Sequence, residues 1–266
     1  MKYEQLPPPD HLKNYIRYFW ILEHDGKTQS LNTLAPLADG CPGIIFQHSS
    51  EGIFYDPSDK HLPEIFLYGQ TITPTDFKVT GKFKTSGVCF HPYALKSIFG
   101  FNASELTDSC MDLTLVMNHL REPLLNAITF TDQIAIFSNS IHQQIRSKNY
   151  QIDPAVEYAL KQIVRSKGNV PLKNLHREIK VSERGFQRRF DQQVGISPKL
   201  FSRVCRFQAS LAQLKSSQYI NLSDVAFDNG YADQSHFIRN FKQFAGFSPY
   251  QFQKRDRSLA ENFSVF

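Results

Sequence analysis

The sequence predicts a two-domain α+β protein, in which a β-rich N-terminal domain precedes an all-α C-terminal domain. Short aromatic and β-branched segments, separated by turn signals, fill residues 13–90. From residue 121 onward, apolar residues recur at helical spacing instead. In the C-terminal part, residues 182–201 repeat at 233–252 with a constant offset of 51, so one small helical unit occurs twice.

The N-terminal segments have the composition and spacing of β-strands. Asp-Gly, Asp-Pro, Ser-Asp and Thr-Pro dipeptides lie between them and mark turns. Short strands at this spacing are typical of a small sandwich or barrel. The expected strands are Tyr15–Leu22, Gly43–Phe46, Ile53–Tyr55, Ile65–Tyr68, Phe77–Phe83 and Ser86–Phe90.

Helices are expected after these strands. Pro92–Gly100 predicts a short helix, and Glu105–Leu120 mixes loop and helix. Residues 121–147 carry apolar side chains at near-helical spacing, which predicts one or two amphipathic helices. Their apolar face either packs on the chain's own barrel or joins two copies of the chain. After a short polar linker, Asp153 and Pro154 supply an N-cap and a first-turn proline for the next helix.

The charge of the chain is divided unequally. Residues 1–150 hold 12 Lys and Arg against 15 Asp and Glu, whereas residues 151–266 hold 18 against 10. A basic C-terminal part fits a nucleic-acid-binding module, although a solvated basic surface would have the same charge. The distribution alone leaves both interpretations open.

Cysteine usage and hydropathy bear on the compartment. The first residues, MKYEQLPPPD, contain no apolar signal-peptide core. No run reaches about 18 apolar residues, the length of a membrane-spanning helix. We therefore expect a cytoplasmic protein with no membrane partner. Four scattered cysteines without a C-x-x-C pair are typical of reduced, mostly buried thiols, and they are Cys41, Cys89, Cys110 and Cys205.

Each copy of the repeated unit predicts a helix-turn-helix. In such a unit a first helix braces a second, whose N-terminal turns face base edges in the major groove of DNA. Each copy combines an N-cap, a Phe-x-x-x-Phe helix, a glycine stop and a Ser-Pro helix start. In the first copy the expected bracing helix is Leu172–Ile179, and Ser182 caps the recognition helix Glu183–Val194. In the second copy the bracing helix is capped by Asn221 and Asp224, and Asp233 caps the recognition helix Gln234–Ala245.

The polar faces of the two recognition helices carry side chains suited to reading bases. Phe186, Phe190 and Val194 recur every four residues on the opposite, buried face of the first helix. Arg matches the paired acceptors of guanine, and Gln can bond adenine in a bidentate way. The predicted base contacts are Arg184, Gln187, Arg188, Gln234, His236 and Arg239, and the predicted phosphate contacts are Ser182, Ser235 and Lys242.

One long helix, Pro198–Ser216, is expected between the two units. It spans roughly 28 Å, which can hold the recognition helices near one turn of DNA, about 34 Å, apart. Its expected inward residues are Phe201, Val204, Cys205, Ala209, Leu211 and Leu214.

The segment AFDNGYADQSHFIRNFKQFAGFSPYQF carries a specific pattern: an Ala, a Gly-aromatic pair, Asp-Gln-Ser, Phe-x-Arg-x-Phe-Lys and Gly-x-Ser-Pro. The residues that fit it are Ala226, Gly230, Tyr231, Asp233, Gln234, Ser235, Phe237, Arg239, Phe241, Lys242, Gly246, Ser248 and Pro249. With this pattern, residues 155–257 resemble the DNA-binding domain of the AraC/XylS family of bacterial transcription regulators.

The resemblance implies seven helices, two helix-turn-helix units and binding of one chain to two adjacent major grooves of double-stranded DNA. It also implies RNA polymerase as a partner. The first unit departs from the family pattern, with His176 where a small Ala is usual and Lys180 where Gly is frequent. His176 either widens the contact between the two helices of this unit or is an ordinary surface or hydrogen-bonded histidine.

The N-terminal segments NYIRYFWILE, LADGCPGIIFQ, LYGQTITP and GVCFHPYALKSIFGFNASELTD resemble the β-rich sensor domains of some members of this family. The resemblance implies a cupin-like barrel with flanking helices that binds a small effector or mediates homodimerisation. The expected division is a sensor domain over 1–120, a helical connector over 121–150 that can mediate dimerisation, and a DNA-binding domain over 155–257.

The metal-binding cupin pattern, two His separated by one residue with a later Glu, is absent. His48 is followed by two serines and His91 by Pro92. We therefore expect no metal and no cofactor.

Two alternative functions remain open. An enzyme built on the barrel would need catalytic side chains, but no spacing motif unites the available His and acidic residues, so no catalytic residue is predicted. A nonspecific architectural DNA binder would show similar affinity for unrelated duplexes, whereas Arg and Gln on both recognition faces favour specific readout. The scattered candidates for an enzyme are Glu23, His24, Asp39, His48, Asp56, His61 and His91.

Overall fold

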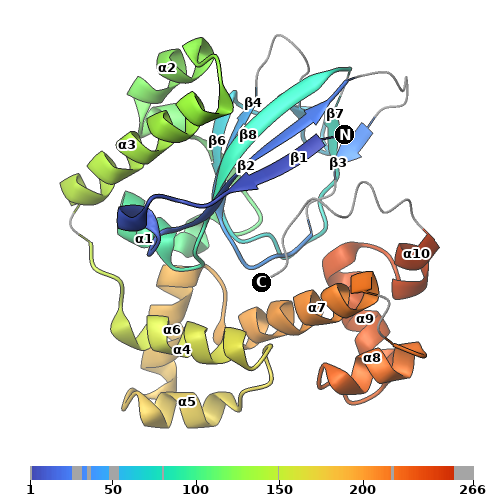
Figure 1. Cartoon of the computed structure of the whole chain (residues 1–266). Coiled ribbons are helices and arrows are strands. Elements are labelled where there is room, and N and C mark those ends of the chain that lie inside the picture. The colour runs from blue at the N-terminus through green and yellow to red at the C-terminus, as the bar shows by residue number, and fades with distance from the viewer. Residues whose placement is uncertain are drawn as a thin grey trace.

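The computed structural model describes residues 2–25, 32–34, 37–47, 54–79, 81–148, 150–216 and 219–254. A β-rich N-terminal domain lies above an all-helical C-terminal domain in Figure 1. Further helices flank the sheet of the N-terminal domain. The predicted α+β two-domain fold is therefore confirmed. Among the described residues, no helix has the length and apolar character needed to cross a membrane.

Two antiparallel sheets form the N-terminal domain. The larger has the strand order β1-β2-β8-β4-β6-β9, and the smaller has the order β3-β7-β5. The strands are β1 (Lys2–Leu6), β2 (Ile16–His24), β3 (Asn32–Leu34), β4 (Gly43–Gln47), β5 (Phe54–Tyr55), β6 (Ile65–Tyr68), β7 (Phe77–Val79), β8 (Phe83–Phe90) and β9 (Cys110–Asp112).

The larger sheet separates two apolar layers, because successive side chains of a strand point to opposite faces. In β4, Ile44 and Phe46 join the cluster that contains helix α1 (Ala94–Phe99). The intervening Ile45 joins the other cluster, on the side of the smaller sheet. Cys89 of β8 belongs to this second cluster as well.

The strands that the sequence misses lie at the sheet edges or in the smaller sheet. β1 and β9 are the two edges of the larger sheet, and β3 is an edge of the smaller one. The β1 sequence, KYEQL, is mostly exposed, so it lacks the apolar alternation that predicts a strand. The expected single strand over 77–83 is wrong, because this segment belongs to two strands, β7 and β8. Gly81, with φ +73°, lies between them. Of the expected strand over 53–55, Ile53 lies outside the described residues.

The connector contains helices α2 (Arg121–Asn126) and α3 (Phe130–Lys148). Phe137 and Ile141 of α3 are fully buried in the cluster that contains α1 and one face of the larger sheet. The apolar face of the connector therefore packs on the chain's own N-terminal domain. Short 3₁₀ turns lie at Asp10–Leu12, Ala103–Leu106, Leu113–Leu115 and Asn118–Leu120.

Seven helices follow among the described residues from Pro154 onward. Asp153 caps the first of them as expected, and its carboxylate accepts a hydrogen bond of 2.9 Å from the Ala155 N–H. After this helix the chain turns at Gly168, where a Cβ would lie 2.0 Å from the Ser202 carbonyl oxygen, so only glycine fits. The helices are α4 (Pro154–Arg165), α5 (Leu172–Glu178), α6 (Glu183–Val194), α7 (Pro198–Ser216), α8 (Leu222–Asp228), α9 (Gln234–Ala245) and α10 (Pro249–Lys254).

Helix α7 is the central element of the C-terminal domain. Near its start, the ring of Phe201 meets Phe190 of α6 edge-on at 5.8 Å. Further along, the ring of Phe207 meets Phe241 of α9 at 5.2 Å. One rigid helix therefore anchors both repeated units.

The predicted inward face of α7 needs two corrections. Ala209 is only half-buried, and Phe207, which the sequence did not place inward, is fully buried. The reason is that α7 has neighbours on more than one side. It contacts α6 and α9, and its Gln208 reaches the N-terminal domain, so its buried surface is wider than a single helical stripe.

The two domains share a packed interface. Leu37 and Ala38, which precede β4, are buried in the core cluster of the C-terminal domain. The Gln208 side-chain amide donates a hydrogen bond of 2.5 Å to the Ala38 carbonyl. On the other side, the Thr107 hydroxyl donates to the carbonyl of Gly195, the C-cap of α6, at 2.6 Å.

Candidate nucleic-acid interface

The first recognition helix, α6, has one buried face and one polar, exposed face. Phe186 and Phe190 are buried, and the Ser182 hydroxyl accepts a hydrogen bond of 3.2 Å from the Gly185 N–H, which fixes where the helix begins. Three of the predicted base contacts on this helix are exposed, namely Arg184, Gln187 and Arg188. They line one shallow surface hollow together with Ser182, Asp191 and Gln192.

Two adjacent arginines of α6 have different surroundings. Arg189 points toward the N-terminus of α4, with its guanidinium 3.7 Å from the Asp153 carboxylate. Arg188 lines the hollow on the polar face instead. Because Arg189 is partly engaged by an acid, Arg188 is the better placed of the two for contact with a base.

The second recognition helix, α9, repeats this arrangement. The Asp233 carboxylate accepts a hydrogen bond of 2.7 Å from the His236 N–H and caps the helix, and Phe237 and Phe241 are fully buried. Before it, Asn221 and Asp224 form the expected reciprocal cap of α8. The predicted contacts Gln234, Ser235, Arg239 and Lys242 are all exposed.

His236 has a different environment from the one that the sequence predicts. Its side chain is half-buried, its Nδ1 accepts a hydrogen bond of 3.4 Å from the Ala232 N–H, and its ring packs edge-on against Tyr231. These contacts hold the turn between α8 and α9. His236 therefore also positions the start of α9 through its ring, and its contact with a base stays a prediction.

The turns of the two units differ in the residue that adopts the left-handed conformation. Lys180 has φ +52° and occupies the place that Gly230, with φ +71°, occupies in the second unit. The equivalence follows from matching hydrogen bonds, in which Lys180 N–H donates to Arg177 and Gly230 N–H donates to Phe227. A left-handed conformation disfavours a residue with a Cβ, which explains why glycine is the better residue here.

His176 lies in the bracing helix of the first unit and is half-buried. Its Nε2 is buried and has no hydrogen-bond partner among the described residues. The sequence left two interpretations of His176 open, and the one as a hydrogen-bonded histidine does not hold for its Nε2 atom.

Tyr231 is the aromatic residue in the turn of the second unit, and burial raises its pKa to about 12.

Among the described residues, those considered for an enzyme do not all meet in one cleft, and only Asp39 and Asp56 of the set line a common cavity, described below. Glu23 forms an ion pair of 3.1 Å with Lys84, and the ring of His24 stacks on Phe83. His91 is hydrogen-bonded to the Lys13 carbonyl at the opposite end of β8. The ring of His61 packs against Tyr55, Asp56 caps a turn, and His48 lies outside the described residues.

A cavity of about 430 Å³ lies in the N-terminal domain, lined by residues of both sheets. Its wall includes apolar side chains such as Ile45 and Phe66 and three acids, Asp39, Asp56 and Asp108. Among the described residues, no Lys, Arg or His lines it. The cavity therefore suits a neutral or positively charged ligand better than an anion.

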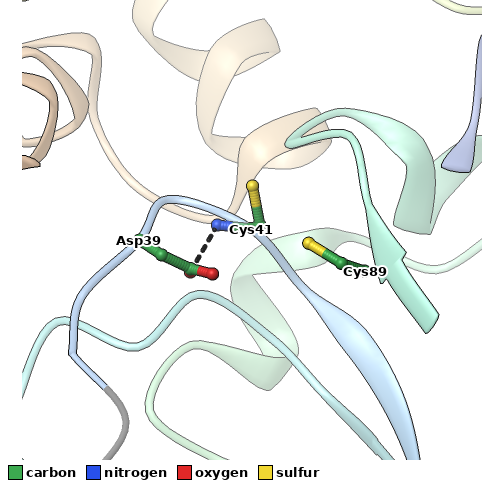
Figure 2. Close-up of side chains that lie close together, drawn as sticks. All are labelled: Asp39, Cys41 and Cys89. Carbon is green, nitrogen blue, oxygen red and sulfur yellow. Dashed lines mark hydrogen bonds between the residues drawn. The ribbon is translucent and has the colours of Figure 1, made fainter. Parts of the chain in front are cut away.

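One polar cluster was not anticipated from the sequence. Asp39, Cys41 and Cys89 each offer a ligand atom, and these three atoms lie within 4.8 Å of one another (Figure 2). The Asp39 carboxylate is held by a hydrogen bond of 2.9 Å from the Cys41 N–H. Burial raises the pKa of Asp39 to about 6, against the opposing effect of this hydrogen bond and of Arg17.

The cluster contains no histidine, so the histidine pattern of cupins does not describe it. An Asp-x-Cys spacing joins the first two residues of the cluster, but Cys89 is distant in the chain and reaches them only because β4 and β8 are neighbours. No local signal could therefore have revealed the complete set.

Two family models match the chain. Residues 175–255 match a helix-turn-helix domain, which confirms the interpretation of the repeated units. Residues 4–112 match a domain of unknown function, DUF6597. A curated relative, an uncharacterised HTH-type transcriptional regulator of Haemophilus influenzae, is 36% identical over 74 residues, which are 28% of this chain and 24% of that protein. The matched region thus spans about a quarter of the relative's length.

Among solved structures, the chain is similar to ToxT from Vibrio cholerae, at 13% identity and a TM-score of 0.48, covering 88% of this chain and 98% of that one. A probable AraC family transcriptional regulator from Rhodopseudomonas palustris covers 39% of this chain and 97% of its own, at 22% identity and a TM-score of 0.36.

Proposed function

We propose that the chain is a regulator of the AraC/XylS type, whose helix-turn-helix region binds DNA sequence-specifically and reads two adjacent major-groove segments. In this proposal residues 1–120 form a sensor domain, 121–150 a connector and 155–257 the DNA-binding domain. The proposal includes no catalytic step, and it places the protein in the cytoplasm with the DNA.

The observation that carries the proposal is the pair of exposed polar helix faces on one rigid support. α6 and α9 are each packed onto α7 by buried phenylalanines, Phe190 and Phe241 respectively. Each helix exposes arginine on the face opposite its core, Arg188 in α6 and Arg239 in α9. Arg184, Gln187 and Gln234 complete the proposed base contacts, and Ser182, Ser235 and Lys242 the proposed phosphate contacts.

The first test is a selection of bound sequences from random duplex DNA by the full chain. Specific binders typically prefer their site over unrelated duplexes by about a thousandfold or more. We therefore expect one enriched site and much weaker binding to its scrambled version. Equal affinity for both duplexes at moderate salt would instead support a nonspecific architectural binder.

The N-terminal domain is proposed to modulate this binding by taking up a small effector. Its cavity of about 430 Å³ is within the usual size range of small-molecule sites. The residues that precede β4 connect this cavity to the DNA-binding domain, because Asp39 lines the cavity while Leu37 and Ala38 are buried in the C-terminal core. RNA polymerase is the further partner that the family membership suggests.

Lys242→Ala is expected to weaken binding to the selected and scrambled duplexes by similar factors. Lys242 is exposed on α9, one helical turn beyond Arg239, where a phosphate contact is natural. The loss of one phosphate contact should flatten the slope of log affinity against log salt by about 0.9. Titrations at several salt concentrations measure this slope. Lys13→Ala, in the N-terminal domain, is the matched control, and an unchanged slope for Lys242→Ala would refute the phosphate contact.

Homodimerisation is proposed as a weak, second mode of assembly. Most of the apolar face of α3 packs on the chain's own domain, but Ile128, between α2 and α3, is 90% exposed. Sedimentation of the full chain should show partial association at tens of micromolar, reduced in Ile128→Ser. Strict monomers at tens of micromolar would remove dimerisation from the account.

A further inference from the structure

The cluster of Asp39, Cys41 and Cys89 lies where the N-terminal domain meets the C-terminal domain. Asp39 and Cys41 precede β4, and Cys89 lies on the neighbouring strand β8, opposite Gly43. Both thiols are buried, whereas Asp39 is half-buried and lines the cavity of the N-terminal domain. Figure 2 shows the carboxylate and the two thiols approaching one another from these two segments.

This set of ligand atoms suits a borderline-soft divalent cation. Thiolate and carboxylate oxygen are both common ligands of Zn²⁺, and catalytic zinc sites use three protein ligands with one open position. Two thiolates bound to one tetrahedral Zn²⁺ lie about 3.8 Å apart, given Zn–S bonds of about 2.3 Å. The three ligand atoms, all within 4.8 Å, therefore need to move by only about 1 Å or less to enclose the ion.

A neighbouring arginine balances the charge of such a site. The Arg17 guanidinium Nη1 donates a hydrogen bond of 3.0 Å to the Cys41 sulfur. Two thiolates and one carboxylate carry three negative charges, which a divalent cation and Arg17 together neutralise. A donor to a metal-bound thiolate also orients that ligand.

A route to the site exists through the cavity. The Asp39 side chain belongs both to the cluster and to the cavity wall, so an ion can reach the carboxylate from this side. The wall carries two more acids, Asp56 and Asp108, which favour entry of a cation.

We propose that Asp39, Cys41 and Cys89 bind one borderline-soft divalent cation of the Zn²⁺ type, with Arg17 as hydrogen-bond donor to the Cys41 thiolate. This reverses the expectation from the sequence that the chain has no metal site, which rested on the histidine pattern alone.

The site also has a physical connection to the DNA-binding domain. The Ala38 carbonyl, next to Asp39, accepts the hydrogen bond from Gln208 of α7. Resting on the proposed function, we infer that the bound cation is an effector, and that fixing Asp39 and Cys41 changes how α7 is held.

The test is metal binding by the full chain, stripped with a chelator and kept reduced. Titration with Cd²⁺ is followed by the ultraviolet thiolate-to-metal charge-transfer band, and Zn²⁺ by calorimetry. We expect saturation at one equivalent, loss of the band in Cys41→Ser and Cys89→Ser, and an unchanged band in Cys110→Ser, the control cysteine outside the cluster. Absence of the band in the wild-type chain, or its loss in Cys110→Ser alone, would overturn the proposal.

Asp39→Asn keeps the proposal testable if the cysteine variants fail to fold. An asparagine retains the oxygen that accepts the Cys41 N–H bond, so the local turn is preserved while the anionic ligand is lost. We expect affinity for Zn²⁺ to fall at least tenfold in this variant. Wild-type affinity in Asp39→Asn would exclude the carboxylate as a ligand and overturn the proposed site.

The proposed effect of the cation on DNA binding is tested separately, by measuring affinity for DNA. Zn²⁺ should change the affinity of the wild-type chain for its selected duplex by about fivefold or more, and should leave Asp39→Asn unaffected. Equal effects on both proteins would refute the link to DNA. Because the metal titrations contain no DNA, they decide the site even if sequence-specific DNA binding is not found.

Discussion

Replacing Phe237 by alanine is expected to lower the free energy of unfolding of the chain by about 3–5 kcal/mol, the usual cost of deleting a buried phenylalanine. Phe237 is fully buried in α9, and its ring lies 5.3 Å from Tyr231 and 5.8 Å from Phe241. A domain of this size is typically stable by only about 5–15 kcal/mol, so the loss should also reduce DNA binding.

Phe227→Ala is the matched control for this variant. Phe227 belongs to the preceding helix, α8, but is 64% exposed, so its removal should change stability by no more than about 0.5 kcal/mol. Chemical denaturation of both variants, followed through the C-terminal transition, measures the difference. Equal stabilities for the two variants would mean that the helix phase assigned to α9 is wrong.

Removing both recognition arginines should have the largest effect on DNA binding. Each of Arg188→Ala and Arg239→Ala is expected to weaken binding to the selected duplex by about 1–3 kcal/mol, the value of a bidentate base contact. The two arginines lie on different helices, α6 and α9, and belong to separate helix-turn-helix units. Their effects should therefore add, giving about 2–6 kcal/mol in the double variant.

Arg189→Ala provides the control on the same helix. Arg189 is turned toward Asp153, so its removal should leave base preference unchanged and affect affinity only slightly. Equilibrium binding of the single, double and control variants completes the thermodynamic cycle. A double variant no weaker than either single variant would show that only one unit touches DNA at a time.

The boundaries of α6, α7 and α9 could be predicted to the residue because their signals are local. Ser182 and Asp233 cap the two recognition helices through bonds to residues three positions on, and left-handed glycines end both helices. Phenylalanines at helical spacing then fix which face is buried. Sequence patterns of this range are complete within one turn of helix, so they do not depend on the rest of the fold.

Features that depend on distant segments could not be predicted in the same way. Phe207 is buried because α7 packs against α9, and Gln208 because α7 also meets the N-terminal domain. The half-burial of His236 comes from the turn that precedes it. The cluster at Asp39 needs two strands to be neighbours, and strand pairing leaves no trace in the local composition.

The measurement that tests the central claim most directly is a base-preference profile of the wild-type chain and of Arg188→Ala and Arg239→Ala over the whole selected site. If one chain reads two adjacent major-groove segments, each variant should lose preference at one or two base positions. The positions affected by the two variants should lie about one helical turn, 10–10.5 base pairs, apart. Loss of preference at the same positions in both variants, or at none, would contradict the account.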